Sequence, residues 1–169
     1  MTVKNAAYYI DQLGLEAHIE GGAFRQTYKS SGTLAQAALP AAFAGDRHFS
    51  TAIYFLLQAG EFSALHRLAS DELWHFYEGE VLSIYEFEAN GQLRVHQLGR
   101  DLQAAQQLQV VVQAGSWFGS RCEVPGGFSL VGCTVAPGFE YDDFCLAAAA
   151  DLITHYPQHA VLIRELCRR

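Results

Sequence analysis

The stretch from Gly60 to Gly79 constrains the fold of this chain most, because it is apolar enough for a core and yet carries titratable groups. His66, Glu72 and His75 lie within ten positions of one another. Apolar runs flank the short segment 69–71, and each run has the length of a strand. The stretch therefore predicts one strand, a tight turn, and a second strand that ends at a glycine.

Strand alternation predicts where the side chains of this stretch point. Because successive side chains lie on opposite faces of a strand, His66 and Leu68 share one face of the first strand. Glu72 and Trp74 share one face of the second strand, whereas His75 points to the other face. A hairpin of these two strands would bring an imidazole and a carboxylate together on one apolar, aromatic wall.

Length and charge limit the classes of protein that this chain can belong to. Its 169 residues are enough for one buried core and few for two, so we expect a single domain over residues 1–169. Half of the residues are hydrophobic and only 17% are charged, which indicates a folded globular protein. The net charge of −7 argues against nucleic-acid or anionic-membrane partners, since both need basic surfaces. We interpret the acidic run 140–143 as a solvated turn.

The cysteines and the N-terminal residues indicate a cytoplasmic protein. The four cysteines form no C-x-x-C pair, so the spacing of a zinc ribbon is absent and small core hydrophobes are the expected role. No signal peptide begins the sequence, and no apolar run has the ~20 residues needed to cross a bilayer.

The order of patterns along the chain predicts a mainly β protein with helices at both ends. Residues 3–13 have helical spacing and stop at Gly14. Gly21 and Gly22 either turn a corner or bring the backbone close to a ligand. Short strands follow, with turn signals every 8 to 12 residues, among them the hairpin signal Asn90-Gly91. We expect a barrel core over about 20–138 and one or two C-terminal helices within 144–167, covering the patterns 144–155 and 161–167.

The spacing of the central stretch resembles the first sequence motif of the cupin superfamily. That motif is a glycine, five residues, His-x-His, three or four residues, a glutamate, six residues and a glycine. Gly60, His66, Glu72 and Gly79 match its spacing, with Leu68 in place of the second histidine.

Roughly residues 3–166 resemble one group of small, largely uncharacterised bacterial and fungal single-domain cupins (Cupin_5-like, RmlC-like). The resemblance implies a double-stranded β-helix, or jelly roll, and no established reaction. It is carried by five segments: 20–25, 50–57, 70–74, 115–118 and 130–139.

The resemblance also bears on metal binding. Cupin metal sites typically take two histidines and a glutamate from the first motif and one histidine from the second. Leu68 and Phe118 stand at two of these four positions, which leaves His66 and Glu72 as the matching ligands. Two protein ligands hold a divalent ion poorly. We therefore expect no cofactor, and keep a divalent metal as an alternative.

Without a metal, His66 beside Glu72 is a candidate acid–base pair. Burial raises the pKa of a carboxyl group and lowers that of an imidazole, while their mutual attraction opposes both changes. The metal-free epimerases and isomerases among the cupins, which act on sugars, are the precedent that the resemblance offers. We predict His66 as the general base, Glu72 as its partner, and Arg25 and Arg121 as contacts for an anionic group. Arg67, next to His66, faces away.

Aromatic side chains are the expected walls of a ligand pocket, namely Trp74, Trp117, Phe118 and Tyr54. The remaining histidines have no matching partner and are expected at the surface: His18, His48, His96, His155 and His159.

The sequence thus predicts a small-molecule-binding cupin, with metal-independent isomerase or epimerase chemistry on a sugar-like or carbonyl compound. The alternatives are a non-catalytic ligand-binding or sensor protein and a metal-dependent dioxygenase. Strands that are apolar on both faces predict a homodimer whose sheets pack together.

Overall fold

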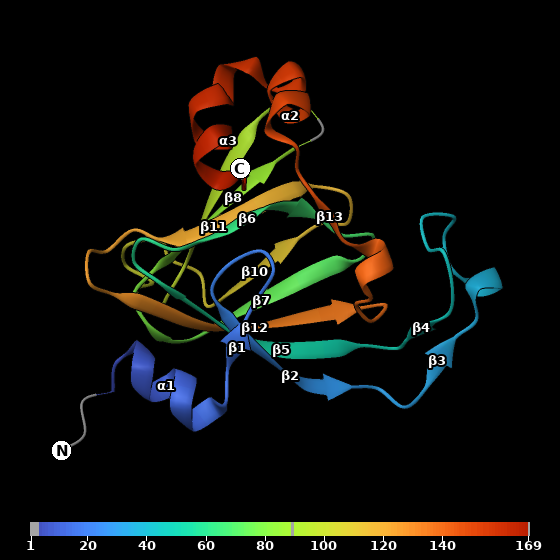
Figure 1. Cartoon of the computed structure of the whole chain (residues 1–169), viewed down its shortest axis with the longest axis horizontal. Coiled ribbons are helices and arrows are strands. Elements are labelled where there is room, and N and C mark those ends of the chain that lie inside the picture. Colours follow the sequence, from blue (N-terminus) through green and yellow to red (C-terminus); the bar gives the residue numbers. More distant parts are fainter. Residues whose placement is uncertain (1–3, 89, 169) are drawn as a thin grey trace.

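Two antiparallel sheets face each other and enclose the interior of the protein (Figure 1). The computed structural model describes residues 4–88 and 90–168. One sheet has six strands, in the order β1 (Glu16–Ala17), β2 (Ala23–Lys29), β5 (Thr51–Gln58), β12 (Phe128–Ala136), β7 (Asp71–Gly79) and β10 (Gln109–Val112). The other has five, in the order β13 (Cys145–Leu146), β6 (Phe62–Arg67), β11 (Trp117–Cys122), β8 (Leu82–Phe87) and β9 (Leu93–Leu98). The predicted jelly roll is confirmed, and β1 and β13 extend it beyond the expected bounds.

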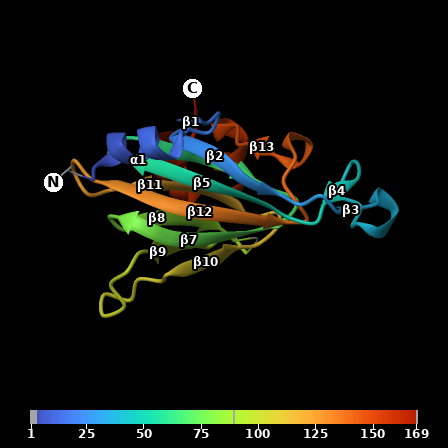
Figure 2. The ribbon, with the colours of Figure 1, turned by 90° about the horizontal axis from the view of Figure 1, so that it is seen from below.

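The space between the sheets is filled with apolar side chains at one end only. Alternate residues of the facing strands, among them Phe55, Trp74, Ile84 and Phe118, form one continuous buried cluster. Figure 2 looks onto the outer face of the six-stranded sheet, with the five-stranded sheet behind it. At the other end β5 and β7 begin and β6 and β12 end, and there polar side chains replace apolar ones.

The central stretch is not a hairpin, which corrects the expectation from its spacing. β6 pairs with β11 and β13, whereas β7 pairs with β12 and β10, so residues 68–70 carry the chain from one sheet to the other. Turn and strand lengths are the same for a hairpin and for a sheet-to-sheet crossing, so spacing alone does not separate them. The expected parity is confirmed, because His75 points outward and contacts the Thr134 hydroxyl at 3.2 Å.

The N-terminal helix covers the outer face of the six-stranded sheet. α1 (Ala6–Leu13) begins after Asn5, whose side chain accepts a hydrogen bond from the backbone of Tyr8, and ends at Gly14 in the left-handed conformation. Its buried side packs against Leu56 and Leu130. The predicted helix is confirmed over these residues; residue 3 lies outside the described residues.

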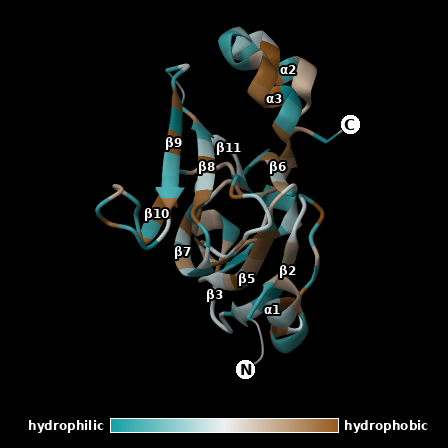
Figure 3. Cartoon of the chain, turned by 90° about the vertical axis from the view of Figure 1, so that its left-hand side faces the viewer, coloured by the Kyte–Doolittle hydropathy of each residue, from teal (hydrophilic) through white to brown (hydrophobic). Residues whose placement is uncertain are grey.

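Two C-terminal helices cover the outer face of the five-stranded sheet, on the opposite side of the barrel from α1 (Figure 3). They are α2 (Ala149–His155) and α3 (Ala160–Leu166), with the 3-10 turn η3 (Pro157–His159) between them. The helix expected from residue 144 starts later, because Cys145 and Leu146 pair with the end of β6 as β13. Cys145 matches the helical stripe in spacing, yet the exposed end of β6 offers its backbone a strand partner.

A long excursion leaves the barrel between β2 and β5 (Figure 1). It holds β3 (Thr33–Leu34), the 3-10 turn η1 (Gln36–Ala38) and β4 (Arg47–His48). Arg47 donates two hydrogen bonds of 2.6 Å to Asp143, in the turn η2 (Tyr141–Asp143), and both side chains are buried. The acidic run 140–143 is therefore not simply a solvated turn, since Asp143 anchors it. No helix among the described residues is long and apolar enough to cross a membrane.

Candidate functional site

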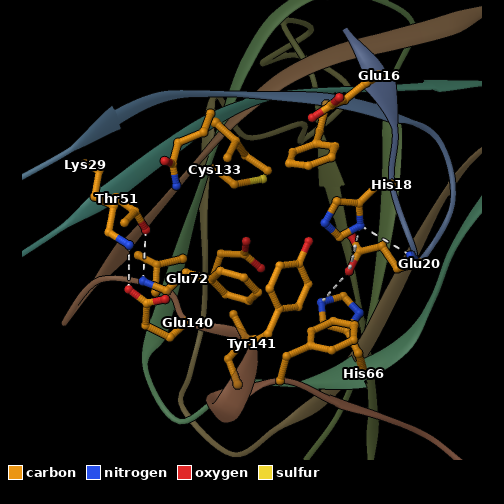
Figure 4. Close-up of a pocket in the computed structure, with 17 residues that line it drawn as sticks. Glu16, His18, Glu20, Lys29, Thr51, His66, Glu72, Cys133, Glu140 and Tyr141 are labelled. Carbon is orange, nitrogen blue, oxygen red and sulfur yellow. Dashed lines mark hydrogen bonds and ion pairs between the residues drawn. The ribbon is translucent and has the colours of Figure 1, made fainter. Parts of the chain in front are cut away.

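The polar end of the barrel opens into a cavity of about 430 Å³ (Figure 4). Its wall is built from β1 and the turn after it, β2, the first residues of β5 and β7, the last residues of β6 and β12, and the segment 139–144. Both sheets therefore contribute, and the sheet-to-sheet crossing at residues 68–70 brings His66, Leu68 and Glu72 to the same cavity.

His66 is held in one tautomer and pairs with Glu20. Its Nδ1 lies 2.7 Å from the carbonyl oxygen of Ala64, which can only accept, so Nδ1 carries a proton and donates it. Its Nε2 lies 3.3 Å from Oε2 of Glu20. The other oxygen of Glu20 accepts a hydrogen bond of 3.0 Å from Ser63. This distance places a carboxyl oxygen of Glu20 beside the ring nitrogen of His66 that does not carry the proton.

The turn before β2 places Glu20 beside β6. Gly21 has φ of 119°, and a Cβ atom there would come within 2.1 Å of the Phe62 carbonyl oxygen, so only glycine allows this close approach. The Glu20 carbonyl accepts hydrogen bonds from the Ala64 backbone at 2.8 Å and from Arg168 at 2.9 Å. The paired glycines thus turn a corner, and that corner delivers the carboxylate of Glu20 to His66.

His18 belongs to the same cavity, which corrects its expected place at the surface. Its Nδ1 accepts a hydrogen bond from the Glu20 backbone at 3.3 Å and lies 3.8 Å from the Glu20 carboxylate. Its ring packs edge-on against Phe24, with centroids 4.4 Å apart. His96 is likewise largely buried, paired with Glu86 at 2.8 Å. The partner of His18 is only two residues away, whereas that of His96 lies on the neighbouring strand.

Glu72 lies on the opposite sheet and is buried, with 7% of its surface exposed. Its Oε2 accepts a hydrogen bond of 3.2 Å from the indole of Trp74. Among residues 4–88 and 90–168, Glu72 forms no ion pair; the carboxylate that pairs with His66 is that of Glu20. His66 and Glu72 face one cavity and influence each other's pKa values, so their predicted partnership is electrostatic and does not involve a direct contact.

Burial moves the pKa values of these groups toward neutrality. It raises the pKa of Glu20 to about 7, against the opposing attraction of His18. It also raises the pKa of Glu72 to about 7, although the nearby His66 opposes the change. Burial lowers the pKa of both His66 and His18. At neutral pH the imidazoles are therefore neutral, while the two carboxyl groups exchange protons readily.

Arg25 and Tyr54 lie outside the cavity, contrary to their expected role in ligand binding. The guanidinium of Arg25 lies 5.8 Å from the ring of Tyr54, on the outer face of the six-stranded sheet. Phe24 and Gln26, on the other face of β2, line the cavity instead. The alternation of side chains along β2 already places Arg25 on the opposite face from Phe24 and Gln26.

A bulge in β2 brings Lys29 to the cavity. The pairing of β2 with β5 shifts between Gln26 and Tyr28, so the side chains beyond it change faces. Lys29 then joins the cavity wall and contacts Glu140 at 2.6 Å. Counting alternate residues places Lys29 outside, so the sequence does not reveal it.

Arg121 and Trp117 also lie away from the cavity. Arg121 contacts Glu165 at 3.0 Å and Glu123 at 3.3 Å, which joins the five-stranded sheet to α3. The indole of Trp117 packs with the side chains beneath the C-terminal helices. The guanidinium of Arg67 stacks over it, 4.7 Å from the ring centroid. Neither of these two predicted ligand contacts lines the cavity. The predicted outward direction of Arg67 is confirmed.

Trp74 and Phe118 support the cavity from behind. The ring of Phe118 lies 4.1 Å from the ring of His66, and Trp74 meets Phe118 edge-on at 6.3 Å. Both are completely buried. They therefore hold His66 and Glu72 in place, and a ligand in the cavity does not reach them directly.

The residues present do not fit a cupin metal centre. Leu68 brings an apolar side chain to the cavity where the motif has a histidine, and Phe118 fills the second-motif position with a ring. In the described part of the chain, no three His, Cys, Asp or Glu side chains gather closely enough to hold a metal ion. Apolar groups do not bind divalent ions, so these two positions contribute no metal ligand.

Two antiparallel sheets that enclose a cavity lined by histidine and glutamate define a cupin barrel. Residues 7–147 match the family described as Cupin superfamily (DUF985), Cupin_5, and the chain belongs to this family.

Two similar solved structures span nearly the whole chain. Protein SO0799 from Shewanella oneidensis is 43% identical, with a TM-score of 0.86, over 98% of this chain and 99% of that one. A hypothetical protein from Leishmania major is 30% identical, with a TM-score of 0.87, over 98% and 100%. An oxalate decarboxylase mutant from Bacillus subtilis, 11% identical with a TM-score of 0.53 over 89% of this chain and 36% of that one, shares the fold alone. No curated protein matches the sequence.

Proposed function

We propose that this cupin binds a small molecule in the cavity and moves protons on it, as a metal-independent isomerase or epimerase of a sugar-like or carbonyl compound. One observation carries the proposal: Nε2 of His66 lies 3.3 Å from Oε2 of Glu20 at the cavity wall, and both residues are buried. A base at this position works in an apolar surrounding, where water does not compete for the proton.

The pair acts as a single base near neutral pH. When Glu20 is ionised and His66 is neutral, the pair can accept one proton, and the pKa of Glu20 of about 7 makes both states accessible. The proton comes from a carbon next to a carbonyl group, and its bonding electrons move to form an enolate. Return of the proton to the neighbouring carbon, together with transfer of a hydroxyl proton between the two oxygens, completes an isomerisation without oxidation or reduction.

Glu72 orients the substrate from the opposite wall. Its Oε2 is engaged by Trp74, so the remaining acceptor capacity of the carboxylate is directed into the cavity (Figure 4). Hydroxyl or amino groups of a substrate can donate hydrogen bonds to it. The substrate would thereby sit between the two walls, with one carbon facing the His66–Glu20 pair.

Hydrogen exchange into substrate tests this function. The protein is incubated in D₂O with ketoses, aldoses and amino-substituted carbonyl compounds, and proton NMR detects deuterium gained next to the carbonyl. We expect exchange with wild type, loss of exchange in His66→Gln and Glu20→Gln, and unchanged exchange in His75→Gln. His75 is the matched control, because it lies in the same stretch but outside the barrel.

Measurements on the same protein samples distinguish the proton-transfer function from the sensor and dioxygenase alternatives. Exchange that survives in His66→Gln contradicts the proposed base, and ligand binding with no exchange favours the non-catalytic sensor. A metal-dependent dioxygenase would carry about one metal ion per chain, which elemental analysis measures. We expect much less than one, and activity that persists in the presence of a chelator.

A further inference from the structure

The cavity has an excess of negative groups. Glu16, Glu20, Glu72 and Glu140 line it, and within the described residues its only lysine or arginine is Lys29. That ammonium is already engaged by Glu140 at 2.6 Å. The arginines expected to meet an anion lie outside. An anionic ligand would therefore enter against unfavourable charge.

Three aromatic rings form one part of the same wall. Phe139, Tyr141 and Phe144 line the cavity, and their centroids are 5.1 to 6.3 Å apart. Their planes are inclined by 71° to 79°, so the three rings pack edge-to-face as one aromatic cluster at the cavity wall. Aromatic faces attract cations, and boxes built of aromatic rings recognise quaternary ammonium groups. Figure 4 labels Tyr141 and Glu72 among the side chains that line the cavity.

The segment that carries these rings is fixed before any ligand arrives. Asp143 is held by two hydrogen bonds from Arg47, and both side chains are buried. Cys145 and Leu146 pair with the end of β6. A rigid aromatic wall loses little freedom on binding, so it favours affinity.

Glu72 is a buried carboxylate without a cationic partner in the described part of the chain. It faces the cavity and is hydrogen-bonded by the indole of Trp74 and the thiol of Cys133, both uncharged groups. An ionised carboxylate away from water is costly unless a cation compensates it. The protein supplies none here, so two things can stabilise the group: a proton, as its pKa of about 7 reflects, or a cation that arrives with a ligand.

We propose that the cavity recognises an organic cation, whose ammonium group lies between the carboxylate of Glu72 and the rings of Phe139, Tyr141 and Phe144. The proposal rests on the proposed function in taking the cavity as the ligand site, and it names the substrate class as an amino-substituted carbonyl compound, such as an amino sugar. The chemistry agrees with this class. An ammonium group next to the reacting carbon makes its hydrogen more acidic and offsets the charge of an enolate, which no free arginine or lysine of the cavity does.

Binding of choline chloride tests the inference against 3,3-dimethyl-1-butanol, an uncharged molecule of nearly the same shape. Calorimetry at pH 8 should show choline binding roughly tenfold more tightly, as a desolvated cation–π contact gives. Glu72→Gln should reduce choline binding to the level of the neutral molecule. Glu78→Gln, an exposed position on the same strand paired with Arg100, should leave it unchanged.

Proton release gives a second readout. Burial, Glu20 and His66 set the pKa of Glu72, together with Trp74 and Cys133, which hydrogen-bond it. A bound cation favours the ionised carboxylate, so choline should bind more tightly at pH 8 than at pH 6 and release protons. The neutral molecule should bind equally at both values. Tyr141→Leu, which retains an apolar side chain, should weaken choline binding more than binding of the neutral molecule.

The outcomes distinguish this inference from the proposed function. Equal affinity for choline and the neutral molecule, no choline binding, or choline binding that is unaffected by Glu72→Gln overturns the inference. Cation binding without deuterium exchange in any amino-substituted compound overturns the proton-transfer function and leaves the inference standing. Deuterium exchange in neutral sugars, with no preference for cationic ligands, overturns the inference and leaves the proton-transfer function standing.

Discussion

Replacing Glu72 with glutamine should stabilise the protein at pH 8. The pKa of Glu72 is about 7 in the folded protein, against 4.5 without its surroundings, because burial disfavours the charged form. Each unit of that difference is worth ~1.4 kcal/mol, so the ionised carboxylate lowers the free energy of unfolding by about 3 kcal/mol. Glutamine carries no charge and keeps an oxygen that accepts the Trp74 hydrogen bond.

The sign of the pH dependence follows from the direction of the pKa change. Between pH 4.5 and about 7 the folded protein holds a proton on Glu72 that the unfolded chain has lost. The stabilising contribution is therefore complete below pH 4.5 and is lost as the pH rises through 7. Wild type and Glu72→Gln should have similar stability near pH 4.5 and differ most at pH 8.

Urea unfolding at a series of pH values measures this difference, with fluorescence from Trp74 and Trp117 as the signal. Subtracting the two profiles isolates Glu72, because the other titrating groups are common to both proteins. Glu78→Gln, a partly exposed carboxylate on the same strand, should follow wild type at every pH. The reasoning fails if Glu72→Gln is no more stable than wild type at pH 8, or if the two profiles run parallel.

Two further predictions concern the turn after β1 and the outer face of the six-stranded sheet. Arg168→Met keeps the packing over Phe62 but removes the hydrogen bond to the Glu20 carbonyl. We therefore expect a loss of about 1 kcal/mol in unfolding free energy and faster amide hydrogen exchange in residues 18–22. Unchanged exchange in these residues would contradict the prediction. The homodimer stays a prediction, supported by exposed apolar side chains at Leu73, Tyr77 and Val111. Light scattering should find a dimer in wild type and monomer in Val111→Asp, and a monomeric wild type would refute the packing of sheets.

The fold was predictable because its signals are local. Alternation along the strands, the turn at Asn90-Gly91 between β8 and β9, and the glycine that ends α1 each act within a few residues. The spacing from Gly60 to Gly79 added the arrangement of the barrel. Which sheet each strand joins is set by distant partners, and for that reason the apparent hairpin was wrong.

The site was only partly predictable, for a related reason. His66 and Glu72 were found because they belong to one spaced motif. Glu20 reaches His66 through a corner that depends on Gly21, some forty residues earlier in the chain, and Lys29 reaches the cavity through a bulge. Neither contact leaves a periodic pattern. Arg25 shows the converse error, since its own strand parity pointed away from the cavity.

The two phenylalanine rings beside His66 have a chemical consequence of their own, and one of them, Phe118, stands where the cupin motif has a metal ligand. The ring of Phe118 lies 4.1 Å from His66 on one side, and that of Phe144 lies 5.2 Å away. Enclosed by rings, the imidazole is desolvated, its pKa falls, and the proton that it could have carried is left to Glu20. A histidine at position 118 would instead add a polar neighbour and favour a metal ion. With a phenylalanine at this position, a neutral imidazole lies beside a carboxyl group that titrates near pH 7, an arrangement suited to the proposed proton transfer.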